Sequence, residues 1–365
     1  MRRALVQVVL SLGAGGTERL VIEMCERLHH DTQIEVVCLD AAGEWAYRVA
    51  TLGIRVTVLE RRPGFQWRLA AGIRRIAKTL PAPVIHCHHY TPFIYGCLAG
   101  LTLPGSKIVY TEHGRYSDGS PSMKRRLANQ FFGRTPGRFF AVSHDLRRHL
   151  ISEGLPAARL EVNHNGIDPG PTPQASARAD ARANLGLAGD DWTIGTVARL
   201  DPVKNLGLLV QAAAHLYQQI PTLKLVFIGD GPDRVMLERA CAQAGIAART
   251  VFTGQRDDAR ALLAGLDTYV NCSVIEGISV TLLEALAAGL AVVATQVGGT
   301  PEILRHEDQG LLIPSRDAQA LTAALARIHT DEALRRHLQQ AARAHIESAF
   351  SIEHMLKRYT DAYGW

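Results

Sequence analysis

With 365 residues, of which 47% are hydrophobic and 21% charged, the chain has the composition of a soluble globular protein and is too long for one ordinary core. No apolar run approaches the roughly 20 residues of a membrane-spanning helix, and the N-terminus lacks the long apolar region of a secretion signal. The six cysteines show no CxxC or Cys/His ligand spacing. We therefore expect a two-domain cytoplasmic protein with buried, reduced thiols.

Apolar runs alternate with helical patterns through the first half of the chain. The helical candidates include Glu18–Leu28, Trp67–Leu80 and His144–Ser152. This alternation predicts βαβ units and a parallel sheet with covered faces. The expected strands are Ala4–Val9, Ile34–Leu39, Arg55–Leu59, Val84–Cys87, Lys107–Thr111 and Phe139–Val142.

The segment Asp168–Asp191 is rich in Ala, Pro, Gly and Arg. Pro169, Pro171 and Pro173 argue against regular structure, so we predict a linker into a second domain. The alternating pattern then restarts, which predicts a second doubly wound sheet and a ligand cleft between the two domains. The strands expected there are Thr193–Ala198, Leu223–Ile228, Val251–Phe252, Asp267–Asn271, Ala291–Thr295 and Leu311–Ile313.

Two loops at predicted strand ends of the first domain are candidates for ligand binding. Gly13–Gly16 follows the first strand and opens a helix, and Asp40 lies further on. The loop partly resembles the glycine pattern of a dinucleotide-binding site, but Glu18 stands where the third glycine belongs. A close approach of the backbone to a phosphate or sugar and a purely structural turn both remain open. His113 follows the fifth strand and either hydrogen-bonds a substrate or satisfies a local partner.

The loop after the first strand of the second domain carries Arg199 and Lys204. A guanidinium can bind a phosphate through two parallel hydrogen bonds, and an ammonium acts as a point charge. Two cations at a strand end therefore suit a diphosphate, although solvated surface charges are the alternative. Gly254 and Arg256 follow a later short strand, at a place where the backbone could meet a nucleobase edge.

The stretch Glu276–Glu284 places two carboxylates eight residues apart. Gly277 permits a tight backbone path, and Ser279 is a suitable N-cap for a helix over Val280–Ala288. The backbone N–H groups from about Ile278 onward would then be the unpaired donors of a helix start, which bind anions. An acid beside a phosphate site suits a phosphate that carries a hydroxyl-rich group such as a sugar. The alternative is an ordinary amphipathic helix with a surface Glu.

Taken together, these motifs resemble those of the retaining glycosyltransferases of family GT4, which have the GT-B fold of two facing Rossmann-like domains. The resemblance runs through almost the whole chain, and the ordered set is far more specific than any single motif. The family often has an aromatic residue and a proline after Glu-Gly, where this chain has Ile278 and Ser279, so the sugar pocket differs locally. The motifs are Gly-Gly-Thr-Glu, Val-Ser-His-Asp, Asn-Gly-Ile-Asp, Gly-x-x-x-Arg-Leu-x-x-x-Lys-Asn, Gly-Asp-Gly-Pro, Glu-x7-Glu and Gly-Gly-x-Pro-Glu.

The resemblance implies a role for each matched residue. Arg199 and Lys204 would bind the donor pyrophosphate, Glu276 the hydroxyls of the donor sugar, and Glu284 the ribose. His113 would lie near the donor sugar, and Gly15 and Gly16 would contact donor phosphate or acceptor. The expected catalytic set is His113, Arg199, Lys204 and Glu276. The expected donor-binding set is Gly15, Gly16, Arg199, Lys204, Gly254, Arg256, Glu276, Gly277, Ile278, Ser279, Val280 and Glu284.

The resemblance further implies an acceptor-binding domain over residues 1–168, a linker over 169–190, a donor-binding domain over 191–350 and a helix over 351–365 that crosses back. The donor would be a nucleotide-diphosphate sugar, a UDP-sugar before a GDP-sugar. The acceptor would be a glycan or lipid-linked glycan of cell-envelope polysaccharide biosynthesis. No cofactor or metal is expected, because the fold tends to work without one and the chain has no Asp-x-Asp pattern. The leaving diphosphate would itself take the acceptor's proton in a front-face substitution.

Two other classes of protein remain as alternatives. A GT-B sugar phosphorylase or epimerase would share the phosphate chemistry without transfer to a glycan, and acceptor-dependent donor turnover separates them. A nicotinamide oxidoreductase would use the loop Gly13–Glu18, and a thermal shift with NAD tests this.

The charge is divided unevenly along the chain. Residues 1–170 hold 22 Lys and Arg against 14 Asp and Glu, whereas the remainder holds 18 against 21. Two basic stretches with aromatic residues lie in the first domain, Arg61–Arg68 and Lys124–Arg138. Cations beside exposed aromatic rings suit an anionic bilayer, so we predict peripheral contact with the inner face of the cell membrane. The alternatives are a solvated basic surface and core positions for Phe131 and Phe132. No nucleic-acid partner is expected.

Overall fold

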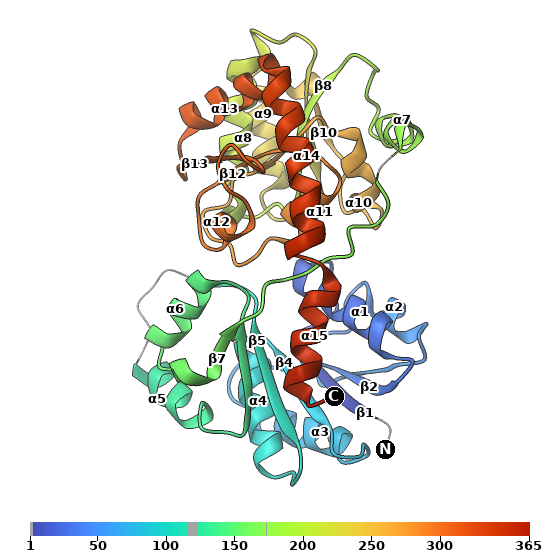
Figure 1. The fold of residues 1–365 in the computed structure, drawn as a ribbon, viewed down its shortest axis with the longest axis vertical. Coiled ribbons are helices and arrows are strands. Elements are labelled where there is room, and N and C mark those ends of the chain that lie inside the picture. Colours follow the sequence, from blue (N-terminus) through green and yellow to red (C-terminus); the bar gives the residue numbers. More distant parts are fainter. Residues whose placement is uncertain (1–2, 116–122, 173) are drawn as a thin grey trace. The chain divides into compact units, whose positions relative to one another are not determined.

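The structure is a computed structural model that describes residues 3–115, 123–172 and 174–365. It divides into two compact units, one formed by the chain up to Asn165 together with Ile352–Trp365, and the other by Gly166–Ser351. Each unit contains one parallel sheet covered by helices (Figure 1). The predicted class of two doubly wound, Rossmann-like domains is therefore confirmed. Within the described residues, no helix is both long and apolar enough to cross a membrane.

The first unit is built on a seven-stranded parallel sheet in the order β3-β2-β1-β4-β5-β6-β7. Each predicted strand is present to within two residues at either end, and β7 is an additional short strand. The strand order reverses between β1 and β4, so their carboxyl ends form the switch point at which such sheets bind ligands. The strands are β1 Arg3–Val9, β2 Thr32–Cys38, β3 Arg55–Val58, β4 Val84–His88, β5 Lys107–Glu112, β6 Gly137–Ala141 and β7 Leu160–Val162.

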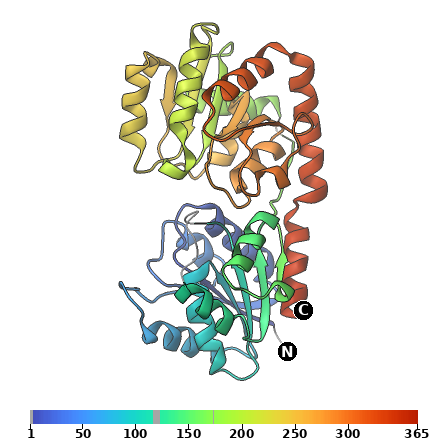
Figure 2. The same cartoon turned by 90° about the vertical axis from the view of Figure 1, so that its left-hand side faces the viewer.

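Helices cover both faces of this sheet. Right-handed crossovers place α1 and α2 on one face and α3 to α6 on the other. Side chains alternate along β4, so that Cys87 lies against Gly96 of α4 while His86 contacts Tyr363 of α15. The last helix therefore packs on the face opposite α4 (Figure 2). The helices are α1 Gly16–Leu28, α2 Ala46–Ala50, α3 Trp67–Ala77, α4 Tyr90–Leu101, α5 Met123–Phe132, α6 His144–Ser152 and α15 Ile352–Tyr363, with a 3-10 turn at Ala157–Arg159.

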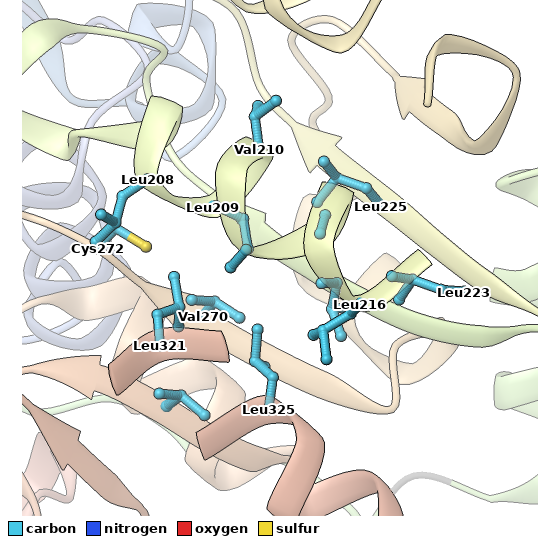
Figure 3. Close-up of a cluster of buried hydrophobic side chains, with 14 of the residues drawn as sticks. Leu208, Leu209, Val210, Leu216, Leu223, Leu225, Val270, Cys272, Leu321 and Leu325 are labelled. Carbon is cyan, nitrogen blue, oxygen red and sulfur yellow. The ribbon is translucent and has the colours of Figure 1, made fainter. Parts of the chain in front are cut away.

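The second unit is built on a six-stranded parallel sheet in the order β10-β9-β8-β11-β12-β13. Its switch point lies between β8 and β11. Helices α8 and α13 bury Leu209, Leu216 and Leu325 against Val270 of the sheet (Figure 3). The strands are β8 Trp192–Val197, β9 Leu223–Ile228, β10 Thr250–Phe252, β11 Thr268–Asn271, β12 Ala291–Thr295 and β13 Leu311–Ile313. The helices are α7 Ala175–Asn184, α8 Leu206–Tyr217, α9 Arg234–Gln243, α10 Ala259–Leu262, α11 Val280–Ala287, α12 Thr300–Ile303, α13 Ala318–Thr330 and α14 Glu332–Ala349, with 3-10 turns at Pro202–Lys204, Ala247–Arg249 and Leu263–Gly265.

The segment predicted to be an irregular linker contains the helix α7. That part of the prediction was wrong, because Ala and Arg are strong helix formers once the chain is past its prolines. The side chain of Arg178 binds Asp267 at 2.7 Å, and the buried Arg182 donates to the carbonyl of Asp191 at 2.8 Å. These bonds fasten α7 to the second unit. Position 173 lies outside the described residues.

All six cysteines are buried and free of disulfide bonds. Burial raises the pKa of the Cys25 and Cys272 thiols to about 12. A thiol with such a pKa carries almost no thiolate at neutral pH. The cysteines therefore serve as small apolar core residues.

Candidate functional site

The centre of the candidate site is the side chain of Glu276, in the loop between β11 and α11. Its Oε1 accepts a hydrogen bond from Lys204 Nζ at 2.5 Å and another from Ser273 Oγ at 2.7 Å. Lys204 comes from the loop after β8, the strand that pairs with β11 at the switch point. The fold thus joins two residues 72 positions apart at the edge where doubly wound sheets bind ligands.

The backbone around Glu276 is fixed from two sides. Gly298 has φ +52°, and a Cβ at this position would lie 1.9 Å from the carbonyl oxygen of Glu276. Only glycine permits this approach of the two loops. The hydroxyl of Thr295 donates to the carbonyl of Ser273 at 2.6 Å, and the N–H of Val274 donates to the carbonyl of Val203 at 2.9 Å. The carboxylate of Glu276 is therefore held by a preformed loop.

The helix that follows begins as expected at Val280. Ser279 is its N-cap, and its Oγ accepts a hydrogen bond from the N–H of Leu282 at 3.3 Å. The side chains of Ile278, Ser279 and Val280 are buried, so a ligand at this helix start would meet backbone N–H groups. The second carboxylate of the motif, Glu284, is also buried, at 3% exposure.

The two predicted cations differ in how the free protein holds them. Lys204 is already paired with Glu276, and one quarter of its side chain is exposed. Arg199 is 69% exposed, and its Nε lies 3.7 Å from Asp201 Oδ2. An exposed guanidinium with one loose ion pair can reorient toward an anion at little cost. Arg199 thus remains available for a ligand beside the Lys204–Glu276 pair.

The structure does not bring Gly254 and Arg256 to this pair. Arg256 forms two hydrogen bonds with Asp258, both 2.7 Å, and these lower the pKa of the Asp258 carboxyl. The carbonyl of Gly254 accepts from the N–H of Gly229 at 3.0 Å, at the carboxyl end of β9. Both residues lie two strands from the switch point, which agrees with a place near a nucleobase better than with one near a diphosphate.

In the first unit, Gly15 is the N-cap of α1 and Gly16 is its first residue. A Cβ at Gly15 would lie 2.3 Å from Glu18 Oε2, so the Glu18 side chain folds back over the glycine loop. Burial raises the pKa of the Glu18 carboxyl. Asp40, the acid that a dinucleotide would need, forms a two-bond ion pair with Arg61. The oxidoreductase alternative loses support from this pairing.

His113 is half-buried and joins a chain of buried polar groups at the end of β4 and β5. Its Nε2 lies 3.0 Å from His88 Nδ1, and His88 Nε2 lies 2.8 Å from Gln7 Oε1. Burial lowers the pKa of both histidines well below the ordinary value, so both rings are neutral at pH 7. His113 thus has a local partner, and its orientation is set by the chain behind it.

Sequence reasoning missed His89, which lies between this chain and the glycine loop. Its Nδ1 is 2.8 Å from Glu112 Oε1, and its Nε2 is 3.2 Å from Thr17 Oγ1. Burial alone would lower the pKa of His89, but the hydrogen bond and charge of Glu112 outweigh it and raise the pKa. The residue has φ +74° and ψ 165°, a region nearly restricted to glycine. The run His-Cys-His-His at a strand end was the available signal.

Comparisons with known proteins agree with this geometry. Residues 177–345 match the model of the glycosyl transferases group 1, and residues 14–170 match that of glycosyltransferase family 4. Both models describe glycosyltransferases, so the protein is a glycosyltransferase. The chain belongs to the family 4, group 1 glycosyltransferases, and it is an enzyme.

Relatives and solved structures extend the comparison. N-acetyl-alpha-D-glucosaminyl L-malate synthase of Bacillus anthracis is 25% identical over 82% of this chain and 79% of its own length. A GDP-mannose-dependent alpha-(1-6)-phosphatidylinositol monomannoside mannosyltransferase of Mycolicibacterium smegmatis is 29% identical over 65% of this chain and 66% of its own. The fold is similar to that of Anabaena HepE in complex with UDP-glucose, with a TM-score of 0.87, 22% identity and 98% coverage of both chains.

Proposed function

We propose that the protein is a retaining glycosyltransferase that moves a sugar from a UDP-sugar to a glycan or lipid-linked glycan of the cell envelope. The observation that carries the proposal is the Lys204–Glu276 pair beside the Ser279-capped helix start at the β8–β11 switch point. The pair combines a cation for phosphate with a carboxylate that accepts hydrogen bonds from hydroxyls. A sugar diphosphate is the ligand that needs both.

In the proposed reaction, Arg199, Lys204 and the N–H groups at the start of α11 bind the two phosphates. Negative charge grows on the diphosphate as the bond to the sugar breaks, so these donors stabilise the transition state more than the bound donor. Glu276 orients the sugar through its hydroxyls, and Glu284 holds the ribose.

The configuration at the reacting carbon is retained when the acceptor attacks from the face that the diphosphate leaves. The departing phosphate oxygen accepts the proton of the acceptor hydroxyl, so no separate base is required. Because Arg199 and Lys204 supply the positive charge, we propose that the reaction needs no metal or cofactor. Turnover should therefore be unchanged by EDTA, and a loss that Mg²⁺ restores would contradict this part.

The nucleotide is tested directly by calorimetry with UDP, GDP and ADP. A relative carries GDP-mannose in its name, and a structural neighbour was solved with UDP-glucose, so both nucleotides must be compared. We expect UDP to bind at least tenfold more tightly than GDP, a difference of about 1.4 kcal/mol. Tighter binding of GDP would change the donor but keep the reaction class. Binding of none of the three would refute the proposed function.

A membrane-bound acceptor is supported by α5. Met123, Leu127 and Phe131 recur at intervals of four along this helix, and each is at least 60% exposed. Lys124 and Arg126 flank this apolar stripe and are also exposed. An amphipathic helix with an exposed apolar stripe and flanking cations suits the surface of an anionic bilayer. We propose that α5 holds the enzyme at the inner face of the cell membrane, as a peripheral protein of the cytoplasm.

The two aromatic residues of Lys124–Arg138 lie in different environments: Phe131 is exposed, whereas Phe132 packs in the core against Phe93. Arg125 is partly buried in an ion pair with Glu153 at 2.8 Å, so it is not a free surface cation. Sedimentation with vesicles tests the proposal. Binding should require anionic lipid, weaken with salt, and fall in the variant Lys124→Ser/Arg126→Ser. Equal binding to neutral and anionic vesicles, or to neither, would contradict it.

A further inference from the structure

The loop between β3 and α3 forms an open hollow of about 700 Å³ that the proposed donor chemistry does not use. Backbone bonds join this loop to its neighbours at the carboxyl edge of the sheet. Asp40 N–H donates to the carbonyl of Leu10 at 2.8 Å, and Arg61 N–H donates to the carbonyl of Leu39 at 2.6 Å. The hollow therefore lies on the same edge as the glycine loop, two strands away. Its lining residues are Glu60, Arg62, Pro63, Gln66, Trp67 and Arg68.

One wall of the hollow is an ordered group of aromatic rings. The side chains of Trp67 and Phe65 are 70% and 55% exposed, which is high for such large apolar groups. They are not loose, because the Phe65 ring stacks on the ring of Tyr95 at 5.5 Å and Trp67 packs edge-on against Phe65 at 4.9 Å. Tyr95 is buried, and its Oη accepts a hydrogen bond from Gln66 N–H at 3.1 Å. The exposed rings are thus held in place by a buried one.

Some polar side chains of this loop form hydrogen bonds within the protein, whereas others remain available to bind a ligand. Arg61 is committed to Asp40, and Arg68 donates to the carbonyls of Leu59 and Glu60. Among the residues that the structure describes, the side chains of Glu60 and Arg62 form no hydrogen bond or ion pair. Both are exposed at the hollow. The loop therefore presents an acid, a guanidinium and an aromatic face to solvent.

We propose that this hollow binds one sugar residue of the acceptor glycan, with the C–H face of the sugar ring on Trp67 and its hydroxyls on Glu60 and Arg62. Aromatic rings offer a large apolar face, and a few placed polar groups give such a site its orientation. The inference rests on the proposed transfer to a glycan. Two strand spacings separate β3 from β1, roughly 10 Å. The bound residue therefore lies away from the reacting hydroxyl, and the acceptor is an oligosaccharide.

A lipid surface fits this hollow less well. Two of the three cations in Arg61–Arg68 are committed within the protein, and Glu60 adds a negative charge that an anionic bilayer would repel. A hollow also offers a sugar ring more contact than a flat membrane. We therefore propose membrane contact for α5 alone and not for Arg61–Arg68.

The experiment uses the fluorescently labelled full chain on an array of bacterial oligosaccharides, with Trp67→Ala, Trp67→Phe and the matched exposed-aromatic control Phe131→Ala. We expect wild type and Phe131→Ala to bind at least one oligosaccharide, and Trp67→Ala to lose about tenfold or more in affinity. Trp67→Phe should recover most of it. Vesicle binding should show the reverse, since it falls in Phe131→Ala and is unchanged in Trp67→Ala.

UDP affinity is measured on the same samples and should be equal in all four proteins. If UDP binds but no oligosaccharide does, or if Trp67→Ala binds oligosaccharide like wild type, the inference is refuted while the donor chemistry stands. If Trp67→Ala loses vesicle binding and keeps oligosaccharide binding, the hollow is a membrane contact and the inference is again refuted. Failure of wild type to bind UDP would instead refute the proposed function.

Discussion

Removal of the cation and removal of the anion of the Lys204–Glu276 pair should have opposite effects on nucleotide binding. In the free protein the ammonium of Lys204 is 2.5 Å from Glu276 Oε1, so a diphosphate must compete with a carboxylate for it. Lys204→Ala removes the phosphate contact. Glu276→Gln keeps the shape of the loop and the Ser273 contact but releases the ammonium from its counter-ion. The first variant should weaken UDP binding, and the second should strengthen it.

The magnitudes follow from the exposure of the pair. A charge-assisted hydrogen bond to phosphate is worth about 1.5–3 kcal/mol. The Lys204–Glu276 pair is partly exposed, so its rupture costs at most about 1 kcal/mol. Lys204→Ala should therefore lower UDP affinity by a net of about 0.5–2 kcal/mol, roughly 2- to 30-fold. Glu276→Gln should raise UDP affinity by up to about fivefold.

Calorimetry with UDP and with uridine measures both effects, because uridine lacks the phosphates and should bind all variants alike. Lys224→Ala is the control, since it removes a lysine from the amino end of β9, the edge opposite the site. Glu276→Gln, despite its tighter UDP binding, and Glu276→Ala should both lower turnover by on the order of 100-fold or more, because the donor sugar loses its anchor. A drop in UDP affinity in Glu276→Gln as large as in Lys204→Ala would show that the carboxylate supports the loop and not the sugar.

Three further outcomes are expected. Arg199→Ala should lower UDP affinity by about tenfold and leave the unfolding free energy within roughly 0.5 kcal/mol, since the side chain is largely exposed; a larger stability loss in urea would contradict a ligand role. Because burial lowers the pKa of His86, His88 and His113, the first unit should lose stability as pH falls below about 6.5, by up to roughly 1.4 kcal/mol per pH unit and ring. His88→Gln should reduce this slope in urea titrations from pH 7 to 5. The pKa of His89 is raised, so its effect on stability has the opposite sign: the stability from its pairing with Glu112 is complete below about pH 6.5 and is lost as pH rises through the raised pKa. His89→Asn should remove this loss of stability with rising pH, and an unchanged slope would refute the pairing.

The sequence was sufficient to predict most of the strands in both sheets. Parallel strands that are buried on both faces form continuous apolar runs, such as Leu223–Ile228 and Ala291–Thr295, and both strands have these bounds in the structure. The strand β7 was missed because three residues with one buried side chain leave almost no pattern. The helix α7 was missed because prolines near its start suggested a loop.

The donor-side site was predicted from local signals that the fold then joined. The cap at Ser279 and the turn at Gly277 are readable within a few residues. The bonds from Lys204 and Ser273 to one oxygen of Glu276 are not, because they depend on how β8 and β11 pair. The contacts of His89 and the hollow beside Trp67 could not be predicted from the sequence for the same reason. His89 matters through contacts with Glu112 and Thr17, which lie far from it along the chain, and Trp67 through a hollow that only the folded loop creates.

The position of α15 has a consequence for how the chain folds during synthesis. His86 Nδ1 lies 2.6 Å from Tyr363 Oη, Thr111 donates to Tyr359 at 3.2 Å, and Asn163 donates to the carbonyl of Met355 at 3.2 Å. The partners of these buried groups lie in α15, which the ribosome synthesises only after the entire second unit. At about 5–20 residues per second, that interval is at least roughly 10 s, far longer than a domain usually needs to collapse. During it the first unit exposes the part of its sheet around His86 and Thr111 that α15 later covers, so chaperones should bind nascent chains that have passed residue 165 and release them once Tyr363 has emerged.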